Sequence, residues 1–183
     1  MADTVPHTTA QPCRQTDETP YPDCHTLSCD GQPGQAEALT PSVALSHIAS
    51  IGAKQAILEY YDTPRWDAIV QGIASGKDDW LRVYEALRRS ADAAAGEDLG
   101  EAIYDALPQR PFEVLSLLSA ESGGTPQQLC TLTFESKRPA DGVGAYLDRL
   151  DQALNQASSK AQREAASACR LGIEATRKAF TKR

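Results

Sequence analysis

Residues 63–87 read TPRWDAIVQGIASGKDDWLRVYEAL, and this stretch decides the fold class. Apolar residues recur three and four positions apart in both halves, at Trp66, Ile69, Val70 and Ile73 and again at Trp80, Val83, Tyr84 and Leu87. Such spacing places them on one face of an α-helix. Ser75-Gly76 ends the first helix, and two helices joined by about four residues must lie nearly antiparallel. Residues 64–90 are therefore predicted to form an αα-hairpin.

The same helical spacing continues on both sides of this hairpin. Thr40-Pro41, Thr63-Pro64 and Thr125-Pro126 each place a capping hydroxyl before a proline suited to the first helical position, and Pro111 starts a helix without such a cap. We expect helices over 41–61, 64–75, 78–90, around 99–107, 112–118, 127–135, 143–154 and 159–180. In the first of them, the residues expected to face inward are Leu45, Ile48, Ile51 and Leu58. Residues 39–183 are therefore predicted to form an all-α domain, an irregular bundle of about eight helices built from αα-hairpins.

Residues 1–38 have a different composition, rich in Thr, Pro, Gln and Asp with few apolar residues. Such a segment cannot bury enough surface to offset chain entropy, so we expect a mostly disordered tail. It contains Cys13, Cys24 and Cys29, and Cys24-His25 with Cys29 has a spacing that zinc sites allow. Because no second well-spaced pair of ligands is present, redox-sensitive thiols are favoured over zinc, and no metal or cofactor is predicted.

Two further cysteines, Cys130 and Cys169, lie on apolar faces of the predicted sixth and eighth helices. They fit two interpretations equally well. Free buried cysteines act as small hydrophobic side chains. A disulfide would instead fasten the terminal helix to the domain, and it would require an oxidising compartment.

The chain is acidic, with a formal net charge of −7 and a pI of about 4.9. An acidic surface repels phosphate backbones, so nucleic acid is not expected as a partner. Residues 158–183 differ, with seven Lys or Arg against two Glu, and Arg163, Arg170 and Arg177 recur every seven residues. These cations either complement the acidic remainder of the domain and the dipole of their own helix, or form a strip that binds a phosphate or a partner. The first interpretation is favoured.

The sequence leaves the compartment open. No segment approaches 18 consecutive apolar residues, so no membrane-spanning helix is expected. The first 20 residues lack the basic and apolar regions of a signal peptide. As written, the sequence predicts a cytoplasmic protein, and a periplasmic one if a leader is missing. The oligomeric state is not predicted.

Acidic side chains are numerous, but their spacing favours a solvated helical face over a catalytic site. Glu97, Asp98, Glu101 and Asp105 follow one helical face, after Asp92. His47 is the only histidine of the predicted domain and has no matched nucleophile, which excludes a Ser-His-Asp arrangement. The run 72–77, GIASGK, is one residue too short for a phosphate-binding loop and joins two predicted helices. No catalytic residue is predicted.

The two tryptophans, Trp66 and Trp80, lie on the facing helices of the hairpin. Their spacing favours the core. The alternative is a shared aromatic edge on a binding surface, since exposed aromatic side chains are typical binding hot spots.

The hairpin and the residues after it contain a sequence pattern that is also found elsewhere. It consists of Trp66-Asp67, Ile69-Val70, the run 72–76, Trp80-Leu81, Val83 and the run 90–93. It resembles a pattern in uncharacterised all-α proteins of proteobacteria, over roughly residues 55–175. Many of those proteins are exported and have two later cysteines, similar to Cys130 and Cys169. They have no known catalytic motif, so the resemblance implies no functional residues. The Cys/Pro-rich start departs from the pattern, where a leader would be expected. In size, acidity and helical content the chain is also similar to small periplasmic immunity proteins of toxin secretion systems.

These observations favour a non-enzymatic protein that binds another protein. A candidate partner is a toxin or effector whose basic active site would meet the acidic residues between 92 and 105. The binding residues expected on this hypothesis are Trp66, Trp80, Asp92, Glu97, Asp98, Glu101 and Asp105. Two alternatives stay open: a hydrolase or lyase with clustered carboxylates in a groove between helices, and a structural envelope protein without a discrete site.

Overall fold

The computed structural model describes residues 39–134 and 138–181, which belong to one compact unit. Within these ranges the chain is α-helical without strands, which confirms the all-α prediction. The expected disordered tail, with Cys13, Cys24 and Cys29 and their zinc alternative, lies outside the described residues.

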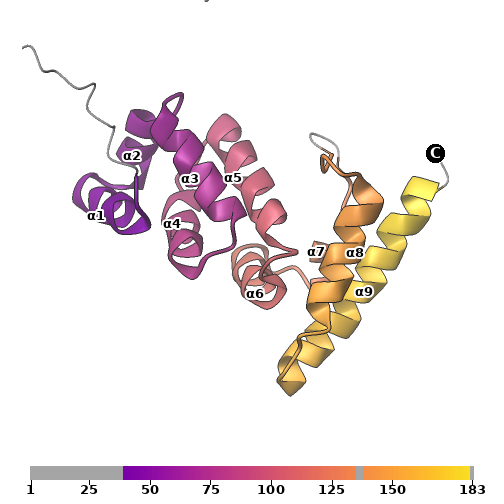
Figure 1. Ribbon diagram of the computed structural model, residues 1–183. Helices are drawn as coiled ribbons and strands as arrows, with labels where there is room; N and C mark the ends of the chain where they lie inside the picture. The colour runs from indigo at the N-terminus through magenta and orange to yellow at the C-terminus, as the bar shows by residue number, and fades with distance from the viewer. Residues whose placement is uncertain (1–38, 135–137, 182–183) are drawn as a thin grey trace, which may run out of the picture. The chain divides into compact units, whose positions relative to one another are not determined.

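The described part of the chain contains nine helices, one more than the sequence predicted (Figure 1). They are α1 Pro41–Ile51, α2 Ala53–Tyr60, α3 Pro64–Ala74, α4 Asp78–Arg88, α5 Ala93–Ala106, α6 Pro111–Ser122, α7 Pro126–Leu129, α8 Val143–Leu154 and α9 Lys160–Thr181. Extensive contacts join α1 to α4, α3 to α5 and, above all, α7 to α9, while α8 lies beside α9.

The three Thr-Pro helix starts are confirmed by capping hydrogen bonds. The backbone N–H of Val43 donates to the Thr40 hydroxyl (3.3 Å), and that of Arg65 donates to the Thr63 hydroxyl (3.2 Å). At α7, Thr125 forms a full capping box, because it accepts from the Gln128 N–H while its own N–H donates to the Gln128 side chain. These bonds satisfy donors that have no partner within a helix, which fixes where each helix begins.

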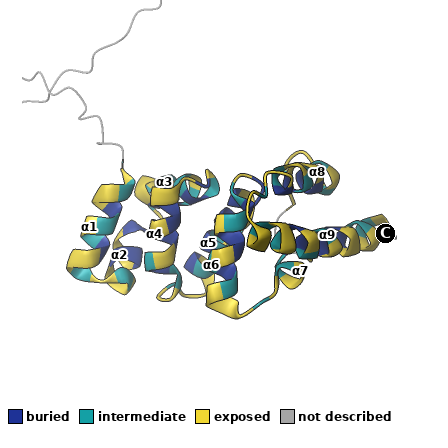
Figure 2. Ribbon diagram, turned by 90° about the horizontal axis from the view of Figure 1, so that it is seen from below, coloured by how far each residue is buried: buried dark blue, intermediate teal, exposed yellow. Residues whose placement is uncertain are grey.

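The predicted hairpin is present as α3 and α4, and it contributes much of the core (Figure 2). Its inward faces are buried, including Ile69, Ile73, Val83 and Leu87, which are fully enclosed. The two helices pack closely because Gly72 of α3 lies directly under the indole of Trp80. A Cβ atom at position 72 would lie only 2.3 Å from the nearest ring carbon.

The helix expected over 41–61 is interrupted, so the prediction of its inward-facing residues was wrong in its C-terminal part. Gly52 adopts a positive φ of 86° and separates α1 from α2. Because the break changes the helical phase, Leu58 is 64% exposed, and α2 buries Ala56, Ile57 and Tyr60 instead. Ile48 of α1 is buried as expected.

The helix expected over 127–135 is also shorter than predicted. It ends at Leu129, because the chain after it is bound to α9. Cys130 forms a disulfide with α9, and the Leu132 N–H donates to the Thr176 side chain. That N–H is therefore not available to a helical carbonyl. We call residues 130–134 the strap.

The arginine stripe of α9 pairs largely within the domain. Arg170 contacts Asp151 (2.7 Å) and Arg177 contacts Asp148 (2.5 Å), both on α8, whereas Arg163 donates to the Ser158 carbonyl. Exposed ion pairs of this kind each contribute about 0.2 to 1 kcal/mol. The stripe thus complements acids of its own domain, as the favoured interpretation expected.

Candidate functional site

The structure places the two tryptophans in the core and not on a surface. Trp66 is 4% exposed and Trp80 is 9% exposed. The indole N–H of Trp66 donates to a carboxylate oxygen of Asp98 (2.8 Å), so this predicted binding acid is engaged inside the domain. Asp92 is the N-cap of α5, where it accepts the Ala95 N–H (3.1 Å). All four residues thus have contacts within the domain that support the fold.

The other three predicted acids come together at one pocket. Glu97, Glu101 and Asp105 follow one face of α5 and line a cavity of about 640 Å³. Its other walls are the strap and residues 138–149, which include the first turns of α8. We call it the α5–α8 pocket. Its volume falls in the range of about 300 to 1,000 Å³ that is typical of ligand sites.

Aromatic side chains form the inner part of this pocket. Tyr104 is 36% exposed, and Phe134 of the strap packs edge-on against the buried Tyr146 of α8, with 5.4 Å between ring centroids. The Tyr146 hydroxyl donates to the Tyr104 backbone carbonyl (2.6 Å), which ties α8 to α5. Burial raises the pKa of both tyrosines, so they stay protonated at physiological pH.

The cationic groups of the pocket already have partners. Arg149 forms a two-pronged ion pair with Asp141, which holds the pKa of that carboxyl below its usual value and raises the pKa of the guanidinium. Arg138 lies over the Phe180 ring, 5.9 Å from its centroid. The pocket wall opposite α5 carries Asp141, Arg138 and Arg149, a net charge of +1, while the α5 wall carries three carboxylates.

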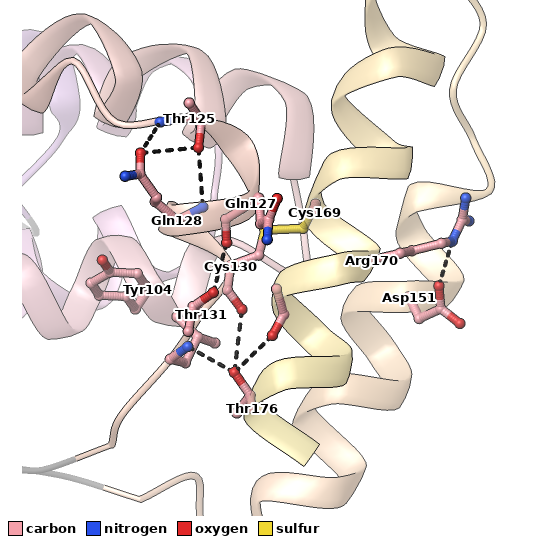
Figure 3. Close-up of a disulfide and its surroundings, with 12 residues drawn as sticks. Tyr104, Thr125, Gln127, Gln128, Cys130, Thr131, Asp151, Cys169, Arg170 and Thr176 are labelled. Carbon is pink, nitrogen blue, oxygen red and sulfur yellow. Dashed lines mark hydrogen bonds and ion pairs between the residues drawn. A yellow bond between two sulfur atoms is a disulfide. The ribbon is translucent and has the colours of Figure 1, made fainter. Parts of the chain in front are cut away.

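The strap is held against α9 by three kinds of contact (Figure 3). Cys130 and Cys169 form a disulfide with a Cα–Cα distance of 5.2 Å, which decides between the two interpretations of these cysteines. Gly172 leaves room for the strap, because a Cβ there would lie 2.8 Å from the Cys130 carbonyl carbon. The buried Thr176 hydroxyl accepts the Leu132 N–H (2.8 Å) and donates toward the Gly172 carbonyl (3.1 Å).

Replacing Thr176 with valine tests the polar part of this contact. The change keeps the shape but removes the acceptor of a buried N–H, so we expect the free energy of unfolding to fall by about 1 to 3 kcal/mol. Urea unfolding followed by circular dichroism measures it. Thr176→Ser, which keeps the hydroxyl, is the control and should lose clearly less. A loss in Thr176→Val below about 1 kcal/mol, or smaller than the loss in Thr176→Ser, would contradict the importance of this hydrogen bond.

The hydrolase alternative would be supported by converging carboxyl groups with a raised pKa. A broader groove of about 890 Å³ between α4, α6, α7 and α9 has Glu113 in its wall, but its bond with Arg110 lowers the pKa of Glu113. Among the described residues, the other carboxyl groups with a shifted pKa are Glu59 and Asp141, and their pKa values are lowered too. A general acid needs a raised pKa. Among the residues that the structure describes, no three His, Cys, Asp or Glu converge as metal ligands.

Sequence reasoning missed the residues that complete the pocket, which are Tyr104, Phe134, Tyr146 and Arg149. Tyr104 carried a usable signal, since it lies outside the apolar stripe of Leu99, Ile103 and Leu107, and an aromatic residue at such a position is exposed. The other three are distant in sequence and carried no local sign of this role.

None of the helices in residues 39–134 and 138–181 is long and apolar enough to cross a membrane. Comparison of the chain with protein-family models, with curated proteins and with solved structures finds no match in any of the three. The resemblance to proteobacterial all-α proteins and to immunity proteins therefore stays a prediction.

Proposed function

We propose that this protein is a non-enzymatic binding protein that engages a basic segment of another protein in the α5–α8 pocket. The observation that supports it is the joining of an acidic wall on α5 to the partly exposed ring of Tyr104 in one cavity. Aromatic side chains are enriched among the residues that anchor protein interfaces. A long basic side chain matches both features, because it has an apolar stem and a cationic end.

The charge of the pocket favours such a partner. Its lining has four carboxylates and two guanidinium groups, a net charge of −2, from Glu97, Glu101, Asp105, Asp141, Arg138 and Arg149. Opposite charge steers a partner during association and fixes its register once bound. A toxin or effector with a basic active site would present a suitable surface, as the sequence predicted.

The spacing of the acids favours an extended partner. Glu97, Glu101 and Asp105 are four residues apart, which corresponds to about 6 Å of helix rise between neighbours. In an extended peptide, side chains on the same side repeat about every 6.6 to 6.8 Å. Lysine or arginine at alternate positions would therefore follow the acidic wall.

A synthetic peptide provides the direct test. We expect acetyl-KSKSK-amide to shift backbone amide signals of residues 97–109 and 131–149 in the NMR spectrum of the full chain, and acetyl-ESESE-amide to leave them unchanged. Glu97→Lys combined with Tyr104→Ala should weaken binding at least about tenfold, because it removes one opposite charge and one aromatic contact. The bond from Tyr146 survives this change, since it uses the backbone of residue 104.

The matched control is Glu174→Lys with Leu171→Ala on α9, where Leu171 is 53% exposed and neither residue lines the α5–α8 pocket. This control should bind the peptide as the wild type does. Affinity capture from native extract should then recover a stoichiometric protein with the wild type and the control but not with the pocket variant. Equal capture by all three proteins would place binding on another surface. The proposal would be contradicted if the wild type captured no stoichiometric protein and did not bind the peptide.

A further inference from the structure

We infer that the Cys130–Cys169 disulfide controls the α5–α8 pocket, so that the pocket has its binding shape only in the oxidised protein. The inference concerns regulation of the site proposed above, and its consequence for binding rests on that proposed function. The change in the pocket itself can be measured without any partner.

The four residues that directly follow Cys130 in the chain form one wall of the pocket. Cys130 forms the bridge, Leu132 bonds to Thr176, and residues Thr131 to Phe134 line the pocket. Figure 3 shows the strap between Tyr104 on one side and the bridge to α9 on the other. A movement of the strap away from α9 must therefore change a pocket wall.

The strap has little support of its own. It follows a helix of only four residues, and it is neither helix nor strand between positions 131 and 134. Its first two N–H groups, of Cys130 and Thr131, donate to carbonyls of α7. Beyond these bonds its backbone is held by three restraints from α9, which are the bridge, the Thr176 hydroxyl and the close approach at Gly172. Segments with few contacts of their own open locally before the rest of a domain. Loss of the covalent tether removes the strongest of the three restraints.

A dithiol reductant supplies the chemistry of release. One of its thiolates attacks a sulfur of the bridge, forms a mixed disulfide and releases the other cysteine as a thiolate, which takes up a proton. Its second thiolate then attacks the mixed disulfide and releases the second cysteine. The reductant is oxidised to its own disulfide by two electrons, and Cys130 and Cys169 become thiols. Both cysteines are fully buried, so the attack requires the strap to open first.

Hydrogen exchange tests the inference on the full chain with Cys13, Cys24 and Cys29 replaced by serine, so that thiol counts report only the bridge. After reduction with dithiothreitol, we expect the Leu132 amide to exchange at least about tenfold faster, with NMR shifts at Tyr104, Phe134 and Tyr146. The indole signals of Trp66 and Trp80 should stay unchanged, because the hairpin lies outside the strap contacts. Acetyl-KSKSK-amide should bind the reduced protein at least about fivefold more weakly.

Thr176→Val in the oxidised protein keeps the test informative if reduction destabilises the whole domain. It should move the same pocket signals in the same direction by a smaller amount, with the bridge intact. Reduction that leaves the pocket signals in place would overturn the inference. It would also be overturned if the tryptophan signals of the reduced protein were lost together with the pocket signals while Thr176→Val left the pocket signals unchanged. If the peptide binds neither form while the pocket signals respond to reduction, the proposed function fails and the structural coupling stands.

Discussion

Replacing both Cys130 and Cys169 with serine is expected to lower the free energy of unfolding by about 4 kcal/mol. The disulfide closes a loop with a sequence separation of 39, and a cross-link of that length removes a corresponding amount of chain entropy from the unfolded state. Both side chains are also fully buried, so the serine hydroxyls need new hydrogen-bond partners. Urea unfolding at neutral pH, in the absence of reductant, measures the difference.

The parent for this comparison carries serine at Cys13, Cys24 and Cys29. Its thiol count in denaturant should be zero before reduction and two afterwards. Reduction of this parent should reproduce most of the loss seen in the double serine variant. A thiol count of two before reduction, or a loss below about 1 kcal/mol, would contradict the structural role of the bridge.

Gly72→Ala is expected to destabilise the domain by about 2 kcal/mol, because overpacking a close contact costs about 1 to 3 kcal/mol. In an exposed helix the same change normally stabilises by about 1 kcal/mol, since alanine restricts the unfolded chain. Here the added methyl group would lie 2.3 Å from the nearest ring carbon of Trp80, whose side chain is buried, so the indole must shift to make room. Steric overlap should outweigh helix propensity, and thermal unfolding measures the sign.

Gly100→Ala is the matched control within another helix. Gly100 lies in α5, and a Cβ atom there meets open space. This variant should gain about 0.5 to 1 kcal/mol, so the two glycine substitutions are expected to have opposite signs. A gain in both variants would mean that the indole of Trp80 adapts easily to the added methyl group.

Local sequence signals predicted the parts of the fold that local interactions determine. The Thr-Pro starts were readable because a capping bond spans only two or three residues, as between Thr63 and Arg65. The α3–α4 hairpin was readable because its apolar face repeats within 25 residues and its connection is short. By contrast, Gly52 breaks the first predicted helix through a single backbone angle, and nothing in the apolar pattern around it signals that break.

The candidate site depends on contacts that are distant in sequence, so only part of it could be predicted. The acids of α5 were found from their helical spacing, and Cys130 and Cys169 were found as a pair with two interpretations. Tertiary structure alone brings Phe134 and Tyr146 beside Tyr104, and places Asp98 at the indole N–H of Trp66. A one-dimensional pattern cannot show which acid of α5 bonds to which distant side chain.

The strap also imposes an order of events during synthesis of the chain. The α5 wall and the strap are made first, but Cys169, Gly172 and Thr176, which hold the strap, are added about 40 residues later. Until then the Leu132 N–H has no acceptor on α9 and the pocket lacks a fixed wall. A chain that stops before residue 169 would carry every acid of the site without its shape. On the proposed function, peptide binding would therefore distinguish chains that include α9 from chains that stop before it.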